Sequence, residues 1–479
     1  MGDNNRENIE NTHRRSFGIH LTSSEIFLKY IFPEIKEKIW KFKWIDLYAG
    51  EGNLILPILD SIPMDSRIDF FKDHINLFDI QPEMVEISIK NAEKYGIPPK
   101  IASRNIKLRN NLESFPRFLI NQNLPLFHIT NPPYLYLGYI RKHKETQEHL
   151  KYFKGKNEGY QDLYQIAMIN DLRNDIEDLI YIIPTNFLFG SAVSNKFRLD
   201  FLKYFRIDMM FIFETKMFDY TGTNVCIGFF KRKQKPKSEN IEFNGVKIKN
   251  NERILEKTYI LKPQFKYRAG SEFYEFLEEY KAQTPLKVNY YLLKKEVMSC
   301  KGEKMISVID ANKYESSQYR RTNLLVNNSL KNSIESNILY VRTVDTGSFE
   351  GRVGLGIISD DFNVAGIYVS GNTYRTHPIQ IFFEPEISHD DHGLLKDYFN
   401  YMLESFREKL DSEFLTTYKY SNAKYTRKYF GLTQVRKLIQ TFPYKKLNYK
   451  YKKMLFNLIE KKDFDKIILF LETCKKEGN

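Results

Sequence analysis

Short apolar runs alternate with amphipathic stretches over the first half of the chain, from about Trp44 to Phe230. Short apolar runs bounded by polar residues are typical of strands buried in a sheet, and apolar spacings of three and four are typical of the helices that cover it. The pattern predicts a helix from Pro82 to Tyr95 and strands over residues 43–47, 75–79, 126–130, 178–183, 209–213 and 225–230. Strands that alternate with helices indicate an α/β fold.

The pattern changes in the second half of the chain. Beyond about Pro263 the apolar spacing becomes irregular, Tyr, Lys, Asn and Arg interleave, and helical spacing returns over residues 392–409 and 449–475. The 479 residues are also too many for one ordinary hydrophobic core. We therefore predict two domains, over residues 1–245 and 265–479, joined by a linker over residues 246–264.

Composition narrows the class of protein. The formal net charge of +13 favours a polyanionic partner, because each Lys or Arg placed on a phosphate releases condensed counterions. The only cysteines are Cys226, Cys300 and Cys474, and their spacing fits neither a disulfide framework nor a zinc site. No apolar run approaches the ~18 residues of a membrane span. These features predict a cytoplasmic protein that does not enter a membrane.

A glycine-rich segment directly follows the first predicted strand. It reads Asp46-Leu-Tyr-Ala-Gly-Glu-Gly52, and Gly50 and Gly52 allow a tight turn with close approach of the backbone to a ligand. Ligands of open α/β sheets lie outside the carboxyl ends of the strands. Asp46 at that edge is placed to engage a cationic amine, and Asp79 at the end of the next strand is placed to accept ribose hydroxyls. A nicotinamide site would add a third glycine and an acid about 20 residues on, and the sequence has neither.

The segment Asn131-Pro-Pro-Tyr134 follows another predicted strand and is the most informative stretch of the chain. Its two prolines stiffen the backbone and bias Asn131 toward extended geometry. The exocyclic amine of a nucleobase is a poor nucleophile, because its lone pair is delocalised into the ring. Acceptors at the Asn131 side chain and the Pro132 carbonyl would favour the geometry in which that lone pair can attack a methyl group. Tyr134 offers a stacking face for the base, worth ~1–3 kcal/mol.

These motifs resemble those of adenine-specific DNA amino-methyltransferases of the gamma motif order, in particular the type II modification enzymes of restriction–modification systems. The resemblance runs motif by motif from residue 16 to about 232, and beyond that it is architectural. It implies a Rossmann-like class I methyltransferase domain with a mixed, mostly parallel, seven-stranded sheet. A C-terminal α+β target-recognition domain would follow. The implied cofactor is S-adenosyl-L-methionine, and the implied reaction is site-specific methylation of the N6 amine of an adenine flipped out of duplex DNA.

The resemblance also assigns residues to roles. Asn110 stands where relatives often carry an acid that contacts the adenine of the cofactor. Phe218 fits the aromatic that sandwiches the flipped base from the side opposite Tyr134, and an ordinary core phenylalanine is the alternative. The predicted catalytic residues are Asn131, Pro132, Pro133, Tyr134 and Phe218. The predicted cofactor-binding residues are Gly18, Thr22, Asp46, Ala49, Gly50, Gly52, Asp79, Ile80, Asn110 and Asn131. No metal is expected.

The second half is expected to recognise double-stranded DNA, with interleaved arginines such as Arg320, Arg321 and Arg342 as candidate base or phosphate contacts. Only fifteen residues precede Ser16, too few for a nuclease domain, so we expect a cognate restriction endonuclease as a separate protein. The enzyme is expected to be a monomer in a prokaryotic cell, associated with the nucleoid.

Two alternatives stay open. The first is methylation of another planar nitrogen: the N4 amine of cytosine in DNA, a base in RNA, or a glutamine side chain of a protein. The second is a DNA-binding specificity protein whose methylase half is degenerate. The motif begins with Asn131, as it does in the adenine-specific relatives. This residue and the basic second half favour adenine in duplex DNA. The presence of Asp46, Asp79 and Asn131 favours an active enzyme.

Overall fold

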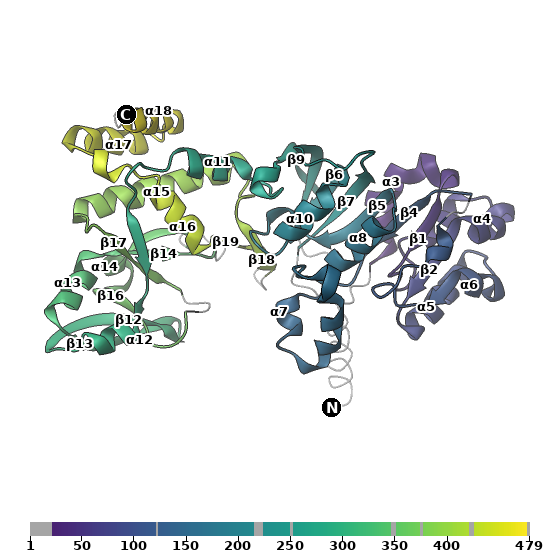
Figure 1. Ribbon diagram of the computed structural model, residues 1–479, viewed down its shortest axis with the longest axis horizontal. Helices are drawn as coiled ribbons and strands as arrows, with labels where there is room; N and C mark the ends of the chain where they lie inside the picture. The colour runs from purple at the N-terminus through teal and green to yellow at the C-terminus, as the bar shows by residue number, and fades with distance from the viewer. Residues whose placement is uncertain are drawn as a thin grey trace. The chain divides into compact units, whose positions relative to one another are not determined.

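The computed structural model describes residues 22–476, except 121–122, 215–223, 250–251, 346–350, 374–376 and 421–425. The chain divides into two compact units (Figure 1). Unit 1 contains residues up to Ala269 together with Lys419–Thr426, and unit 2 contains Gly270–Tyr418 and the residues from Arg427 onward.

Unit 1 is built on one nine-stranded sheet with the order β3-β2-β1-β4-β5-β7-β6-β8-β9. The strands from β3 to β5 are parallel, β7 runs antiparallel to both β5 and β6, and β8 pairs parallel with β6. The sheet is therefore mixed and mostly parallel in its first half. The strands are β1 (Lys43–Asp46), β2 (Ile75–Asp79), β3 (Ile106–Leu108), β4 (Leu126–Thr130), β5 (Asp178–Pro184), β6 (Phe205–Phe213), β7 (Val225–Arg232), β8 (Ile241–Lys249) and β9 (Glu252–Leu261).

Burial along these strands explains their near-continuous apolar runs. All five residues of β2 are buried, as are all but the first residue of β5. Successive side chains of a strand point to opposite faces, so helices must cover the central sheet on both sides. The helices of unit 1 are α2 (Ser24–Ile26), α3 (Phe32–Ile35), α4 (Arg67–His74), α5 (Pro82–Lys94), α6 (Pro99–Asn105), α7 (Leu137–Ile140), α8 (Leu163–Arg173), α9 (Asn186–Phe189) and α10 (Asn195–Leu202).

The structure agrees with the predicted strands and differs from the sequence prediction at the end of unit 1. The residues predicted as a linker, 246–264, complete β8 and form β9, so the sheet has nine strands instead of seven. Ile241, Phe243 and Ile248 are buried, while intervening polar residues such as Glu242 and Asn244 are exposed. The two strands were not predicted because many charged residues lie along them, and such residues are also typical of a solvent-exposed loop.

Unit 2 is an α+β unit with two four-stranded sheets, of order β10-β17-β14-β15 and β11-β16-β12-β13, plus the larger part of the two-stranded β18-β19, whose residues 419, 420 and 426 are counted with unit 1. Its long helix α15 begins behind Ser388, whose side chain accepts a hydrogen bond from the Asp391 N–H and caps the helix. The strands are β10 (Lys287–Tyr290), β11 (Leu292–Leu293), β12 (Lys304–Glu315), β13 (Gln318–Val326), β14 (Leu339–Arg342), β15 (Gly354–Ile357), β16 (Gly366–Val369), β17 (Ile379–Glu384), β18 (Thr416–Tyr420) and β19 (Thr426–Tyr429). The helices are α11 (Ser271–Glu279), α12 (Lys294–Ser299), α13 (Asn328–Ser336), α14 (Ile358–Phe362), α15 (His389–Leu410), α16 (Leu432–Ile439), α17 (Tyr449–Glu460) and α18 (Phe464–Lys476).

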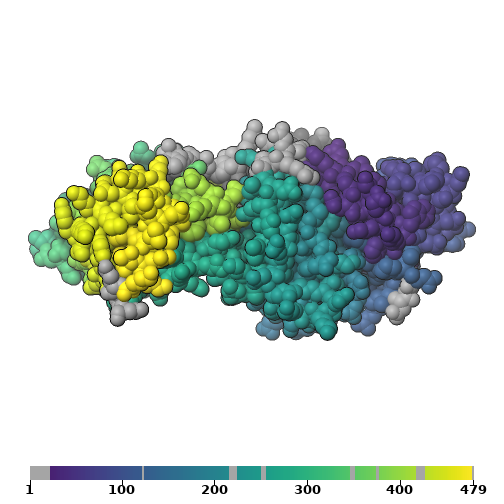
Figure 2. All heavy atoms as spheres, turned by 90° about the horizontal axis from the view of Figure 1, so that it is seen from above, coloured from purple at the N-terminus to yellow at the C-terminus, as the bar shows by residue number. Residues whose placement is uncertain are grey.

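The C-terminal helices α17 and α18, in yellow, lie at the surface of unit 2 in the space-filling view of Figure 2. They pack on each other, and α17 also packs on α15. Within the described ranges, no helix combines the length and the apolar character that crossing a lipid bilayer requires.

Candidate active site

The glycine loop turns sharply where β1 ends. Gly50 and Gly52 have φ angles of 53° and 81°, in the left-handed region that favours glycine. A Cβ atom on Gly52 would also lie 2.7 Å from both Leu56 Cδ1 and Ser88 Oγ. The backbone therefore requires glycine at position 52, and the loop stays close to the first turn of the segment that follows it.

Asp79 ends β2 and is bound to the glycine loop. Its carboxylate accepts hydrogen bonds from the Gly50 N–H at 2.8 Å and from the Gln81 N–H at 2.9 Å. The side chain is 8% exposed, and burial raises the pKa of Asp79 while these backbone N–H groups oppose the rise. The carboxylate is thus held in one orientation at the carboxyl edge of the sheet.

Asp46 ends β1 and is almost fully buried. Its Oδ1 atom accepts both the Thr130 hydroxyl at 2.5 Å and the Tyr48 N–H at 2.9 Å. Burial raises the pKa of Asp46 to about 7, and these two hydrogen bonds oppose the rise. Asp46 therefore connects the end of β1 to the end of β4, directly before the Asn131 loop.

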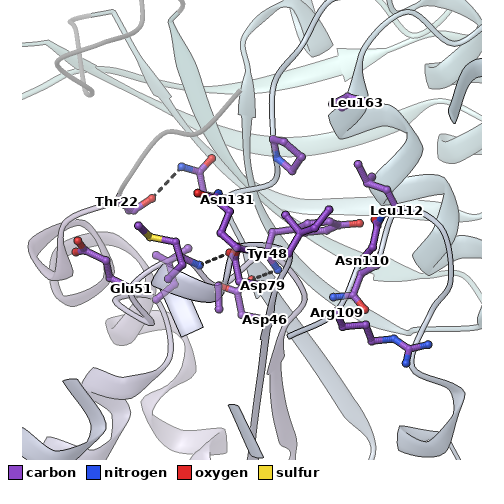
Figure 3. Close-up of a pocket in the computed structure, with 18 of the residues that line it drawn as sticks. Thr22, Asp46, Tyr48, Glu51, Asp79, Arg109, Asn110, Leu112, Asn131 and Leu163 are labelled. Atoms are coloured by element: carbon purple, nitrogen blue, oxygen red, sulfur yellow. Dashed lines mark hydrogen bonds between the residues drawn. The ribbon is translucent and has the colours of Figure 1, made fainter. Parts of the chain in front are cut away.

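A pocket of about 890 Å³, part of it open to solvent, lies at this edge of the sheet (Figure 3). It is lined by Thr22, Asp46, Tyr48, Ala49, Gly50, Glu51, Asn53, Leu54, Asp79, Ile80, Gln81, Met84, Arg109, Asn110, Asn111, Leu112, Asn131, Pro133, His149, Tyr152 and Leu163.

Asn131 points into this pocket and is held on two sides. Its Nδ2 donates to Thr22 Oγ1 at 2.9 Å, a bond drawn in Figure 3. Its Oδ1 accepts from the Tyr134 hydroxyl, which also lies 2.6 Å from the Ile182 carbonyl oxygen. The amide is therefore oriented with its nitrogen toward Thr22 and its oxygen toward Tyr134.

Many residues predicted from the sequence meet in this pocket. Those that line it are Thr22, Asp46, Ala49, Gly50, Asp79, Ile80, Asn110, Asn131 and Pro133. Gly52 shapes the loop without lining the wall, and Pro132 is buried. Gly18 and Phe218 lie outside the described residues.

Tyr134 does not lie where a stacking face in this pocket would be. Its ring is 8% exposed, does not line the pocket, and meets Tyr164 edge-on at 6.4 Å. The stacking role of Tyr134 stays a prediction, while its hydroxyl has a clear structural role toward Asn131.

Several pocket residues were not predicted from the sequence. Tyr152 comes from a 3₁₀ segment, Lys144–Phe153, and its hydroxyl accepts a hydrogen bond from Asn110 Nδ2 at 2.9 Å. Asn111 is buried and donates to the Leu47 carbonyl at 2.7 Å. Tyr48 lies inside the glycine loop itself. Of the three, only Tyr48 had a signal in the sequence, namely its position between Asp46 and Gly50.

Comparison with known proteins gives a family for part of the chain. Residues 106–281 match the family model described as N-6 DNA Methylase. This match includes the Asn131 loop and confirms the resemblance to DNA amino-methyltransferases that the motifs indicated. No curated protein matches the chain.

A solved structure supports the fold. The type IIL restriction–modification enzyme MmeI, solved in complex with DNA, has a TM-score of 0.51 at 13% identity, covering 92% of this chain and 70% of that one. This likeness confirms the predicted fold class. A DrdV–DNA complex matches at 14% identity and TM-score 0.39, covering 53% of this chain and 31% of that one. The M protein of the type I enzyme EcoKI matches at 13% identity and TM-score 0.31, covering 59% of each chain. The present chain thus spans less than two thirds of the DrdV and EcoKI chains.

Proposed function

We propose that this protein is a site-specific DNA methyltransferase that transfers a methyl group to the N6 amine of adenine. The observation that carries the proposal is the Asn131 loop, which follows β4 and opens into the same pocket as Asp46 and Asp79. The match of residues 106–281 to the N-6 DNA methylases supports it. Protection of host DNA in a restriction–modification system is the role that fits this activity.

The residues of the pocket fit S-adenosyl-L-methionine, which supplies an electrophilic methyl group when bound. The fixed carboxylate of Asp79 can accept the hydroxyls of a ribose. Asp46 can balance the positive charge of an amine, and a pKa of about 7 leaves it able to ionise near neutral pH. Ile80 and Leu112 offer apolar surface for a purine, with Asn110 as a polar group beside them.

Asn131 would orient the substrate amine. Its amide oxygen can accept two hydrogen bonds, so the one from Tyr134 is compatible with a second from the amine. The contact with Thr22, which accepts from the amide nitrogen, stabilises the orientation in which the amide oxygen faces Tyr134 and the substrate. Bound S-adenosyl-L-methionine would supply the methyl group and keep the electrons of the broken methyl–sulfur bond, while Asn131 would hold the amine that receives the methyl group and releases one proton. The protein's contribution is mainly alignment and local polarisation.

Recognition of double-stranded DNA would belong largely to unit 2. Its solvent-exposed or half-exposed arginines, such as Arg320, Arg321 and Arg342, are suited to phosphates and guanine edges. The target adenine would leave the duplex before reaching the pocket. We propose further that the enzyme is a monomer and that its cognate restriction endonuclease is a separate protein.

The test is the variant Asn131→Ala assayed with DNA and isotope-labelled cofactor. Loss of methyl transfer with retained cofactor binding is expected, because Asn131 acts on the amine. Asn123→Ala is the matched control, since Asn123 is exposed and precedes β4 at the opposite end from the pocket. Mass spectrometry of the nucleosides from wild-type reactions should detect N6-methyl-2′-deoxyadenosine. Methyl groups on cytosine, on RNA alone or on protein would refute the proposal, as would full turnover by Asn131→Ala.

A further inference from the structure

A hydrogen-bonded cluster of polar side chains lies buried behind the wall of the pocket. His128 comes from β4, Tyr181 from β5 and Asp171 from α8. His128 Nδ1 lies 2.6 Å from Asp171 Oδ2, and the Tyr181 hydroxyl donates to the same oxygen at 2.5 Å. All three side chains are 0–1% exposed. None of them lines the pocket, and the proposed mechanism uses none of them.

The other nitrogen of His128 reaches the glycine loop. The Leu47 N–H donates to His128 Nε2 at 3.2 Å, across 81 residues of sequence. The Leu47 carbonyl accepts from Asn111 Nδ2 at 2.7 Å. Both sides of the Leu47 residue are therefore held by side chains from elsewhere in the fold. Leu47 stands between Asp46, which faces the pocket, and Tyr48, which lines it.

This geometry specifies one form of the imidazole. A backbone N–H only donates, so Nε2 must accept and carries no proton. The remaining proton is then on Nδ1, where Asp171 accepts it. The partner at one ring nitrogen decides which nitrogen is protonated, and here Asp171 and the Leu47 N–H select the same neutral tautomer.

We propose that Asp171 and His128 are positioning residues of the cofactor site, which hold the glycine loop through the Leu47 N–H by fixing the tautomer of His128. Asp171 orients the imidazole, the imidazole fixes Leu47, and Leu47 sets the placement of its pocket-facing neighbours Asp46 and Tyr48. The assignment rests on the proposed function only in naming the cofactor that the loop binds.

Conservative variants of His128 separate the two contacts. In His128→Gln, the amide oxygen can replace Nε2 as acceptor for the Leu47 N–H. In His128→Asn, the shorter side chain can still donate to Asp171 but does not reach Leu47. We expect the dissociation constant for S-adenosyl-L-methionine to rise about tenfold or more in His128→Asn, because the Leu47 N–H loses its acceptor and the loop no longer holds Asp46 and Tyr48 in place. The rise should be clearly smaller in His128→Gln.

Asp171→Leu provides an independent variant of similar size. It removes the acceptor of the Nδ1 proton, so the imidazole loses the partner that fixes its tautomer and its orientation toward the Leu47 N–H. Its cofactor affinity should fall as in His128→Asn, although it removes no atom that contacts the loop. His74→Gln is the control for general destabilisation, because His74 is also a buried histidine of unit 1 and its Nδ1 is hydrogen-bonded to the Phe42 carbonyl ahead of β1.

The measurements are calorimetric titration with S-adenosyl-L-methionine and ¹⁵N NMR of the histidine side chains. In the wild-type protein, His128 should be protonated at Nδ1 and not at Nε2. This measurement uses the wild-type protein alone, so it does not depend on whether a variant folds. The reverse tautomer, or an imidazolium, would overturn the inference. Equal losses of cofactor affinity in His128→Asn, His128→Gln and His74→Gln would also overturn the inference, because equal losses are what a purely structural role of His128 predicts. A wild-type protein that shows the Nδ1 tautomer but binds no cofactor would instead contradict the proposed function.

Discussion

The variant Asp46→Asn should make the free protein more stable and make its cofactor site weaker. In the native structure, Oδ1 of Asp46 accepts both the Thr130 hydroxyl and the Tyr48 N–H. An asparagine at this position can keep both bonds through its own Oδ1 atom. The substitution therefore removes a buried charge with little change in packing or hydrogen bonding.

The magnitude follows from the pKa of Asp46, which burial raises from the ordinary 3.8 to about 7. The folded protein then binds a proton more tightly than the unfolded chain, so the stability contribution of protonated Asp46 is complete below about pH 4. It is lost as the pH rises through about 7. The difference between the two pKa values corresponds to a loss of about 4 kcal/mol at most in the free energy of unfolding. Asp46→Asn should escape this loss and unfold at a higher denaturant concentration than the wild type near pH 8. The two proteins should converge near pH 4.

Cofactor affinity should respond in the opposite direction. Near pH 8 the ionised carboxylate can pair with a cationic amine, and its loss should raise the dissociation constant about tenfold to a hundredfold. The ratio of the two dissociation constants, variant over wild type, cancels the titration of the ligand itself. This ratio should decrease toward one as the pH falls from about 7 to 5. Urea unfolding and calorimetric titration across this range provide the measurements. A variant less stable than the wild type near pH 8, or a ratio that does not change with pH, would refute the reasoning.

Three further changes test other parts of the site. Gly52→Ala should destabilise unit 1 by about 1–3 kcal/mol in thermal unfolding, because it places a Cβ atom against Leu56 and Ser88 at a positive φ; unchanged stability would mean that the loop is not as close-packed as described. Asp79→Ala should weaken cofactor binding by tenfold or more in titrations, since the ribose hydroxyls lose their proposed acceptor and the Gly50 N–H of the loop loses its own; an unchanged dissociation constant would contradict the assignment of Asp79 to the ribose. Tyr134→Phe should lower the rate constant of methyl transfer with little effect on cofactor affinity, because only the hydroxyl that contacts Asn131 is lost; an unchanged rate constant in single-turnover assays would show that this contact is dispensable.

The sequence by itself determined the main strands and the residues of two motifs. The strands β2 and β4 have the predicted bounds, because a buried strand needs apolar residues on both faces and polar residues where it ends. Asp46 and Asp79 were recognisable because the carboxyl ends of neighbouring parallel strands meet at one edge of a sheet. The family match to residues 106–281 confirms the resemblance that the Asn131 loop indicated.

The tertiary structure alone decided which side chains complete the site. The alternating strands β8 and β9 were hidden by their charged faces, and pairing with β6 is what makes them part of the sheet. Tyr134 was expected to present its ring, yet its hydroxyl contacts Asn131 and its ring is buried. No prediction from the sequence concerned His128, which lies within β4. Its partners lie 43 and 81 residues away along the chain, at Asp171 and Leu47. Local sequence patterns report which face of an element is buried, whereas contacts over such separations exist only after the strands and helices have packed together.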